Sequence, residues 1–477
     1  MHNSSPAPFA SAPAQRSPFP GQPNTLQEIC LTQQEDDLFN LFVATTEHIR
    51  QTRPDLPPVI LRVAGGWVRD KLIGKESEDV DIAIDTMKGE AFAQALKTYM
   101  ESVGMATISI GTIHLNPDKS KHLETAVAKV NEHTVDFVHL RTETYNEDSR
   151  NPEVDFGTPM EDALRRDITI NALFYNLHTR QVEDFLGKGI DDLRVGRIRT
   201  PLEPYQTFID DPLRILRVIR FATRFAAAID QEILEAAGQP DIQDAFLKKI
   251  TRERVGTEVD KMLKGRDPVR FLSIIDEIGF YNVVFRPPQV EDVVVDSRIA
   301  FIRARVVESL LTYEGLHRIV PSIVYPLAAE DRRLLYLTAA VAPFEGLIWT
   351  EPSKPTPKNV PPREPKLHPV ARLSVSQTLK LTNQDADSAS GILTFAPEIS
   401  RMVLEHSQSK EGLDRTRLGL LVREVAAKPL FAKWAIAVLF SLVREISFLF
   451  GHDEAISISG EWNLRLVLAR VWGRADI

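Results

Sequence analysis

The feature that most constrains this chain is a glycine pair followed closely by two aspartates. An apolar run ends in Gly65-Gly66, a short helical pattern follows over 67–73, and a second apolar run carries Asp79 and Asp81. Side chains at i and i+2 of a strand point to one face, so both carboxylates are expected to project together, away from the core. The pattern therefore predicts a strand–turn–helix–strand unit.

This unit is equipped for metal-assisted transfer of a phosphoryl or nucleotidyl group. Two adjacent carboxylates repel each other, so an ordered pair usually holds cations. A glycine pair that opens a helix lets backbone N–H groups approach an anion closely. Together, Gly65-Gly66 and Asp79/Asp81 suggest a phosphate-binding turn beside a metal site. For either motif alone, an ordinary turn or a solvated strand edge is the alternative.

The whole-chain composition is that of an ordinary globular protein with several domains. Its 477 residues exceed the usual size of one domain. No apolar stretch is long enough to span a bilayer, so we expect no membrane partner. The single cysteine, Cys30, excludes internal disulfides and fits a reducing compartment.

Charge is distributed unevenly along the chain. The formal net charge of −9 does not by itself favour a nucleic-acid partner. Yet Arg214, Arg217, Arg220 and Arg224 follow one another without an acid between them, within an arc of about 120° on a helix. Such a basic stripe suits a phosphate-rich ligand, and a solvated helix face is the alternative.

The N-terminal residues 1–34 are expected to lie outside the folded part. They begin with a Pro-, Ser- and Ala-rich stretch that has no acid before Glu28. Such a stretch forms either a disordered tail or a weak organellar transit segment. We therefore expect a location in the cytoplasm and nucleus, with mitochondrial targeting left open.

Strand and helix patterns alternate up to about residue 175. Strands are predicted over 59–64, 79–84, 124–130 and 134–140, helices over 35–51, 67–73 and 89–101, and a hairpin over 105–115 that turns at Gly111-Thr112. Beyond about residue 200 the apolar spacing is almost wholly helical. Helices are predicted over 211–226, 242–263, 267–280, 297–312, 371–382 and 429–450. The proline-rich stretch 351–369 is predicted to be a linker or a long surface loop.

Two further segments add candidates to the site. Asp136 lies on a predicted strand with alternating apolar neighbours and is the candidate third carboxylate; an isolated polar residue on an exposed face is the alternative. The segment 162–176 reads DALRRDITINALFYN and predicts a basic pair before a helix. Arg166 followed by Asn171 suits a triphosphate and a sugar hydroxyl. Capping of that helix is the alternative role for Asp167.

A possible base-reading pair occurs in the segment 210–217, DDPLRILR. Asp211 and Arg214 are three residues apart and share one helix face. A carboxylate accepts from an exocyclic amine, and a guanidinium donates to a ring nitrogen. Cytosine and adenine both present these groups, whereas uracil and guanine present a carbonyl beside a ring N–H. A surface ion pair worth under about 1 kcal/mol is the alternative.

Taken together, these blocks resemble those of the class II tRNA nucleotidyltransferases, the CCA-adding enzymes, and more closely their eukaryotic and fungal members. The resemblance covers about residues 58–285. Its five motifs occur in the family's order, at 65–81, 165–172, 183–193, 210–214 and 252–256. Asp210 is a mild departure, because the family often has Glu there.

The resemblance implies an α+β N-terminal head of the polymerase-β-like nucleotidyltransferase fold, followed by an all-α neck, body and tail. The head is expected over 35–200 and the nucleotide-selecting neck over 201–290. The body is expected over 291–350, and the tRNA-binding tail over 370–477, after the proline-rich segment.

The resemblance also implies template-independent addition of C, C and A to the tRNA 3′ end from CTP and ATP, with release of pyrophosphate. Asp79 and Asp81 would hold two Mg²⁺ ions, with Asp136 as the third catalytic residue. The implied nucleotide contacts are Gly65, Gly66, Arg69, Arg166, Asn171, Asp211, Arg214, Arg217 and Arg220. The partner would be the acceptor stem and 3′ end of tRNA, bound by a monomer.

Three other functions remain open from the sequence. The chain resembles bacterial-type poly(A) polymerases in head and neck, and some fungi divide the reaction between a CC-adding and an A-adding enzyme. A non-catalytic RNA-binding protein that retains the scaffold is a different class. The presence of Asp79, Asp81 and Arg214 argues against that last function.

Overall fold

The computed structural model describes most of the chain between residues 28 and 451. The described ranges are 28–77, 79–106, 108–113, 125–130, 133–145, 152–290, 293–312, 327–352, 365–408 and 433–451, with four isolated positions between the last two. The expectations for residues 1–27 and for most of the proline-rich stretch lie outside these ranges. The chain divides into two compact units, Met1–Ala237 and Gly238–Ile477.

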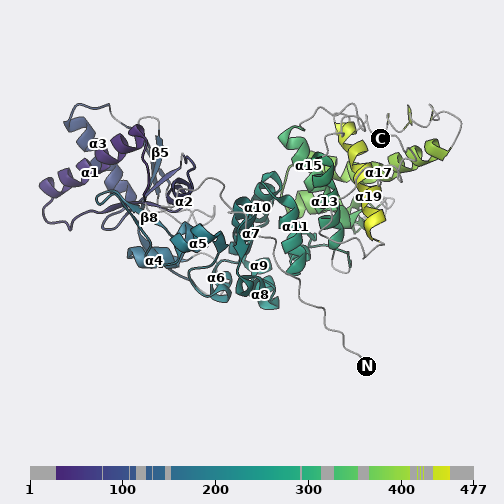
Figure 1. The fold of residues 1–477 in the computed structure, drawn as a ribbon, viewed down its shortest axis with the longest axis horizontal. Helices are drawn as coiled ribbons and strands as arrows, with labels where there is room; N and C mark the ends of the chain where they lie inside the picture. The colour runs from purple at the N-terminus through teal and green to yellow at the C-terminus, as the bar shows by residue number, and fades with distance from the viewer. Residues whose placement is uncertain are drawn as a thin grey trace, which may run out of the picture. The chain divides into compact units, whose positions relative to one another are not determined.

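The first unit is built on a seven-stranded mixed sheet in the order β3-β4-β5-β2-β1-β8-β9. Figure 1 labels two of these strands, β5 and β8. Its strands are β1 (Leu61–Ala64), β2 (Val80–Ile84), β3 (Ile110–Ile113), β4 (Thr125–Val130), β5 (His133–His139), β8 (Phe174–Asn176) and β9 (Gln181–Glu183). Only β2 and β5 pair in parallel; the other neighbours are antiparallel.

Two helices pack on this sheet through aromatic residues. Helix α1 (Gln33–Thr52) begins with a capping box in which Thr32 and Glu35 satisfy each other's backbone N–H groups. Helix α3 (Gly89–Ser102) packs beside it. Phe42 of α1 and Phe92 of α3 both contact Phe137 of β5, with ring centroids 5.4 and 5.2 Å apart. This burial fixes which face of β5 points to the core.

The hairpin predicted over 105–115 is wrong in its turn. Gly111 and Thr112 lie inside β3 and pair with Val127 and Ala126 of β4. A Gly-Thr pair is compatible with a turn, but it can also continue a strand when a neighbouring strand accepts its backbone hydrogen bonds. Here β4 supplies the partner.

Helix α2 (Gly66–Leu72) follows β1, as predicted. The helix predicted after Asp167 is wrong, because the chain makes one 3₁₀ turn over Thr169–Asn171 and then enters β8. Pairing of β8 with β1 satisfies the backbone groups that a helix would otherwise satisfy. This unit also contains five further helices: α4 (Pro159–Leu164), α5 (Gly189–Val195), α6 (Pro204–Asp210), α7 (Arg214–Phe225) and α8 (Gln231–Ala237). Two short strand pairs lie outside the main sheet. They are β6 (Arg141–Thr144) with β7 (Glu153–Phe156), and β10 (Arg197–Ile198) with β11 (Ala228–Ile229).

The second unit is helical apart from one short ribbon, β12 (Ile348–Thr350) with β13 (Leu367–Pro369), at the ends of the proline-rich stretch. Its helices include α9 (Pro240–Lys249), α10 (Arg252–Lys264), α11 (Pro268–Glu277), α12 (Tyr281–Phe285), α13 (Arg298–Thr312), α15 (Ala329–Ala340), α17 (Asn383–Gln408) and α19 (Trp434–Gly451). The single helix predicted over 242–263 is therefore two, broken at Ile250.

The helix predicted over 371–382 is also shorter than expected. Four helical residues, α16 (Val370–Leu373), lead into one π-helical turn, η4 (Ser374–Thr378). Lys380 then adopts a left-handed conformation with φ 52°. The Leu379 carbonyl packs so closely on Gly256 that a Cβ at Gly256 would lie 1.6 Å from it. This tertiary contact, which local spacing does not encode, ends the helix.

The predicted fold class is confirmed: a mixed sheet with covering helices forms the N-terminal half, and helices dominate the C-terminal half. Among the described residues, every helix is too short or too polar to cross a membrane.

Candidate active site

The predicted acidic residues meet on two neighbouring strands. The parallel register of β2 and β5 places Asp81 opposite Asp136. Asp79 lies just before β2 and acts electrostatically on both of them. Val80 and Val135 are buried while Asp79 and Asp81 are exposed, so the carboxylates project from the sheet on the side away from the core.

Crowding makes this acidic pair harder to ionise. Burial and then the neighbouring Asp136 carboxylate raise the pKa of Asp81, and Asp79 adds to the effect. Burial and Asp79 likewise raise the pKa of Asp136. Arg166 acts in the opposite direction on Asp81, which shows that a cation lies nearby.

The carboxylates suit a metal that takes the rest of its ligands from a substrate. Among the described residues, no three His, Cys, Asp or Glu side chains gather closely enough to form a metal site by themselves. Mg²⁺ commonly binds through one or two carboxylates and completes its shell with substrate phosphates and water. The adjacent Asp81 and Asp136, with their mutual repulsion, fit that mode of binding.

The turn between β1 and α2 requires glycine at Gly65. This residue has φ 74° and ψ −117°, a region that L side chains rarely adopt. A Cβ here would also lie 2.7 Å from Nη1 of Arg166. The Gly65 N–H donates to the Leu173 carbonyl at 2.9 Å. Phosphate contacts from this turn would therefore come from the N–H groups that follow, starting with Gly66.

Arg69 lies inside the protein, where its donors meet protein partners. The residue is 3% exposed, and Phe221 and Phe225 of α7 flank its guanidinium at 5.3 and 4.8 Å. Its Nε donates to Asp70 at 2.9 Å, and Nη1 donates to the side-chain oxygen of Asn171. Arg69 thus ties the glycine turn to α7. Direct contact with a nucleotide remains a prediction.

Asp167 links the glycine turn to α7 by a second route. It accepts from the Asn171 amide at 3.0 Å and from Nε of Arg217 at 2.8 Å. Burial by itself would raise the pKa of Asp167, but Arg217 and Asn171 outweigh it and hold that pKa at about 2. The helix-capping alternative is wrong, because no α-helix follows Asp167. The residue is an ionised partner of Arg217.

Helix α7 carries the basic stripe as predicted. Arg217 pairs with Asp167 at 2.7 Å, and Arg224 with Asp70 at 3.2 Å. Arg220 lies 4.1 Å from the ring centre of Phe221. Arg224 therefore holds α2 against α7, and Arg217 holds Asp167 there, so the stripe is more than a solvated face.

Arg214 begins α7 and is 6% exposed. Its Nη2 donates to the Arg165 carbonyl at 2.6 Å and to the Tyr145 hydroxyl at 3.2 Å. Asp211 is half-buried, accepts from the backbone N–H of Leu213 at 3.2 Å, and acts electrostatically on Tyr145. The expectation that both residues share one helix face is wrong, because Asp211 is extended at the end of α6 and α7 begins only at Arg214. Both residues nevertheless lie near Tyr145, and the surface ion-pair alternative does not fit the buried Arg214.

Two residues at this site were missed by sequence reasoning. Tyr145 donates to Glu143 at 2.7 Å, and Glu143 lies 3.9 Å from Arg214. Burial raises the pKa of Tyr145, while Arg165 and Arg141 help to lower the pKa of the buried Glu143. The four-residue strand β6 carries no periodic signal that would have indicated either residue.

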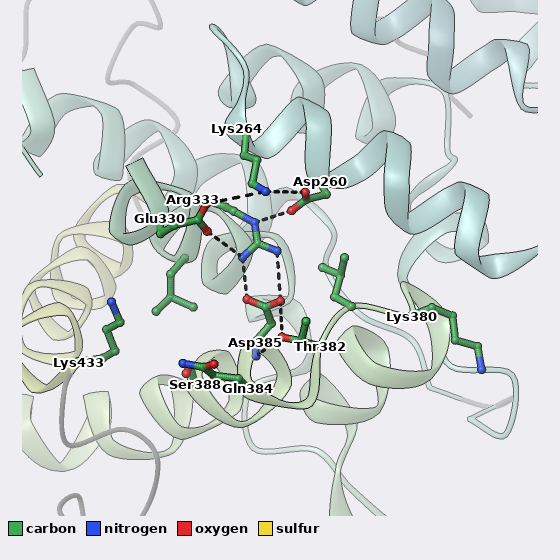
Figure 2. A pocket seen from close by; sticks show the side chains of 12 residues that line it. Asp260, Lys264, Glu330, Arg333, Lys380, Thr382, Gln384, Asp385, Ser388 and Lys433 are labelled. Carbon is green, nitrogen blue, oxygen red and sulfur yellow. Dashed lines mark hydrogen bonds and ion pairs between the residues drawn. The ribbon is translucent and has the colours of Figure 1, made fainter. Parts of the chain in front are cut away.

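The second unit contains a separate polar cavity of about 510 Å³ (Figure 2). Arg333 of α15 lies at its centre and donates to Asp260 of α10 and to Asp385 of α17. Lys264 pairs with Asp260 at 2.9 Å. Because these charges neutralise one another, the cluster acts first as a link between three helices.

Comparisons with known proteins agree with this geometry. The family model of the poly(A) polymerase head domain matches residues 61–199. A model described as the probable RNA and SrmB-binding site of polymerase A matches residues 240–293. The first match contains the acidic pair, the glycine turn and Arg166.

Solved structures share the fold. A CCA-adding enzyme in complex with ATP aligns over 91% of this chain and 86% of its own, with a TM-score of 0.57 and 18% identity. A Thermotoga maritima CCA-adding enzyme with tRNA aligns over 93% of each chain, with a TM-score of 0.57 and 17% identity.

Sequence relatives extend the match. The mitochondrial CCA tRNA nucleotidyltransferase of Saccharomyces cerevisiae is 51% identical over 54% of this chain and 48% of its own length. The chain thus matches only about half the length of the first such relatives. The tRNA nucleotidyltransferase cca1 of Schizosaccharomyces pombe is 36% identical over 83% of this chain and 76% of its own. With that identity over most of both sequences, the chain belongs to the tRNA nucleotidyltransferase family.

Proposed function

We propose that this protein adds C, C and A to the 3′ end of tRNA from CTP and ATP without a nucleic-acid template. The observation that carries the proposal is the register of Asp81 with Asp136, next to Arg166 and the Gly65 turn. The acidic edge would hold the metal ions, and the neighbouring turn with Arg166 would hold the phosphates. The names of the relatives support the choice of tRNA, CTP and ATP.

The reaction requires an RNA 3′-hydroxyl to attack the α-phosphorus of the triphosphate. The 3′-oxygen bond to phosphorus forms, the bond to the β-phosphate breaks, and pyrophosphate leaves. Two Mg²⁺ ions, when bound, would supply charge neutralisation of the phosphates and lower the pKa of the hydroxyl. Asp79 and Asp81 would hold them, and Asp136 would accept the hydroxyl proton. The raised pKa of Asp136 suits proton acceptance.

Substrate phosphates would bind beside the glycine turn and the Arg166 guanidinium that packs against it. The absence of a Cβ at Gly65 leaves room for the Arg166 guanidinium. A guanidinium presents a planar set of donors that suits phosphate oxygens. Asn171, whose carbonyl accepts from Arg166, would add the sugar contact.

Base selection would fall to Asp211 and Arg214. Arg214 is held by the Arg165 carbonyl and by Tyr145, so its orientation is fixed before a nucleotide arrives. Fixed donors discriminate better than mobile ones, because a mismatched base leaves them unpaired. Arg217 and Arg220 would extend the contact along α7.

The helical C-terminal half would hold the acceptor stem of tRNA by contacts to the sugar–phosphate backbone. Catalysis by a monomer is part of the proposal, since every proposed catalytic and base-reading residue belongs to the first unit of one chain. The relatives from Saccharomyces cerevisiae and Candida glabrata are named as mitochondrial. A mitochondrial share beside the cytoplasm and nucleus is therefore proposed.

The proposal is tested by extension of tRNA that lacks CCA. Each nucleoside triphosphate is supplied separately and then all are supplied together. The expected products are two C additions with CTP alone and a complete CCA end with CTP and ATP. Long A runs would indicate a poly(A) polymerase. Incorporation of C only, or of A only onto a CC end, would indicate a specialised enzyme.

Replacement of Asp79 and Asp81 by Ala separates catalysis from RNA binding. We expect loss of extension with retained tRNA affinity. Unchanged extension would remove both residues from the mechanism, and tRNA binding without extension by the wild-type protein would indicate a non-catalytic RNA-binding protein.

A further inference from the structure

Five hydrogen bonds converge on the carboxylate of Asp162, a residue of the six-residue helix α4. Its side chain is 2% exposed. The backbone N–H of Arg141 supplies one bond, at 3.3 Å, and two arginine side chains supply the other four. A buried carboxylate with this many donors is fixed in one orientation.

Each oxygen of this carboxylate binds a different arginine. Oδ1 accepts from Nε and Nη2 of Arg165 at 3.0 and 2.5 Å. Oδ2 accepts from Nε and Nη2 of Arg166 at 3.1 and 2.8 Å. Both guanidinium groups therefore dock through the same edge, which fixes the plane of each group.

For Arg166 this leaves Nη1 as the donor that points away from Asp162. That nitrogen donates to the Asn171 carbonyl at 3.0 Å. It also lies 2.7 Å from the place where a Cβ on Gly65 would be. Arg166 is thus held at two points, with its outer edge at the glycine turn and its charge acting on Asp81.

The charge of Asp162 is secured by the same two arginines. Burial alone would raise the pKa of this carboxyl, but Arg166 and Arg165 lower it to about 2. The group therefore stays ionised at neutral pH. Loss of that charge would remove the anionic partner of the half-buried Arg166 guanidinium, whereas Arg165 would keep Glu143 at 3.3 Å.

We propose that Asp162 is a positioning residue that orients Arg166 toward the phosphates of the incoming nucleoside triphosphate. This inference rests on the proposed nucleotidyl transfer. Because phosphates are common to all nucleotides, loss of Asp162 should weaken the binding of CTP, ATP and pyrophosphate to a similar extent. A change in the preference between bases is not expected.

Binding is measured by calorimetry on the full-length protein, with CTP, ATP and pyrophosphate as the probes and Mg²⁺ present. The Asp162→Asn variant keeps the shape of the side chain but removes its charge. We expect all three dissociation constants to rise by a similar factor, roughly tenfold or more, as for other losses of orientation. Asp162→Glu keeps the charge and should recover part of the affinity.

Glu35→Gln is the matched control. Glu35 is 3% exposed, pairs with Lys71 at 2.8 Å and accepts from the Trp67 side chain at 3.1 Å. Its loss should lower the melting temperature as the loss of Asp162 does, with unchanged dissociation constants. If both variants lose stability and neither loses affinity, Asp162 is only structural and the inference is overturned.

A double-variant cycle makes the test independent of folding differences. The Arg166→Gln variant should weaken pyrophosphate binding as much as the double variant Arg166→Gln with Asp162→Asn does, because Asp162 acts through Arg166. Additive losses would overturn the inference. If the Asp162→Asn variant does not fold, Asp162→Glu replaces it in the same double-variant cycle.

Failure of the Asp162 proposal can be distinguished from failure of the proposed function. A wild-type protein that binds nucleotides but fails to extend tRNA refutes CCA addition while leaving the Asp162 test intact. A wild-type protein that extends tRNA, with an Asp162→Asn variant of unchanged affinity, refutes only the positioning role.

Discussion

Asp81 and Asp136 face each other across the one parallel strand pair of the seven-stranded sheet. Side chains opposite each other on neighbouring strands lie close enough to interact, and like charges in that position destabilise the sheet. Burial and then the Asp136 carboxylate raise the pKa of Asp81, and burial and then Asp79 raise the pKa of Asp136. Such a costly arrangement fits a site that is stabilised by a bound cation.

Asp81→Asn should stabilise the protein while abolishing nucleotide transfer. A carboxyl whose folded pKa is raised destabilises the fold as pH rises through that pKa, so removing its charge at neutral pH should raise the melting temperature. Added Mg²⁺ should raise the melting temperature of the wild type more than that of the variant. Asp155→Asn, on the exposed strand β7, is the control and should change neither property. A lower melting temperature for Asp81→Asn would contradict the repulsion.

Activity should fall in acid at a higher pH than an ordinary aspartate would predict. Both carboxylates must be ionised to hold a metal or accept a proton, and their pKa values lie above the usual value. Protonation therefore begins earlier as pH is lowered. The kcat/KM for CTP in C addition, measured against pH, gives the midpoint because it reports ionisation of the free enzyme. A rate that stays flat down to about pH 4, near the ordinary aspartate pKa, would contradict the raised values.

Gly65→Ala should damage both stability and triphosphate binding. The Gly65 backbone, with φ 74° and ψ −117°, lies in a region that L residues rarely adopt and that costs them on the order of 1–3 kcal/mol. The new Cβ would also displace Arg166. Gly74→Ala is a matched control, because Gly74 has φ 71° but a Cβ added there would meet nothing within 4 Å. Thermal unfolding should show a loss in both variants, and the KM for CTP should rise only in Gly65→Ala. Equal KM values would exclude the clash with Arg166.

Asp211→Ala should relax base choice more than it weakens triphosphate binding. The carboxylate is proposed to accept from the exocyclic amine of cytosine or adenine, a group that uracil lacks. Competition between CTP and UTP in tRNA extension measures the discrimination, and pyrophosphate inhibition measures phosphate binding. Unchanged rejection of UTP would remove Asp211 from base selection.

Arg333→Met should destabilise the second unit. The Arg333 side chain is 7% exposed and joins Asp260 to Asp385. Removing one partner of a buried ion-pair cluster leaves uncompensated charge and costs on the order of 3 kcal/mol. Lys264→Ala, on the 47% exposed partner of Asp260, should cost under about 1 kcal/mol. Denaturant unfolding measures both, and a small loss for Arg333→Met would show that the cluster is not a structural link.

The parts of the site that could be predicted from sequence all lie on regular, periodic elements. Asp79 and Asp81 follow from alternation along β2, and the arginine stripe follows from the spacing on α7. Asp136 could be placed on a strand, but not opposite Asp81. That required the parallel pairing of strands more than 50 residues apart.

The parts that could not be predicted depend on contacts between distant segments. Tyr145 reaches Arg214 across 69 residues, and Arg217 reaches Asp167 across 50. Asp162 lies in a helix too short to give a periodic signal. Its role depends on which way two arginine side chains turn.

By itself, the sequence determined the strand–turn–helix–strand unit, the mixed-sheet head and the helical remainder, because apolar periodicity and glycine conformation act within a few residues. Only the tertiary structure decided that β8 replaces the helix predicted after Asp167, that Arg69 is enclosed by α7, and that Asp162 holds Arg166. Buried polar groups must find partners wherever the fold brings them, and such partners are set by packing between distant segments.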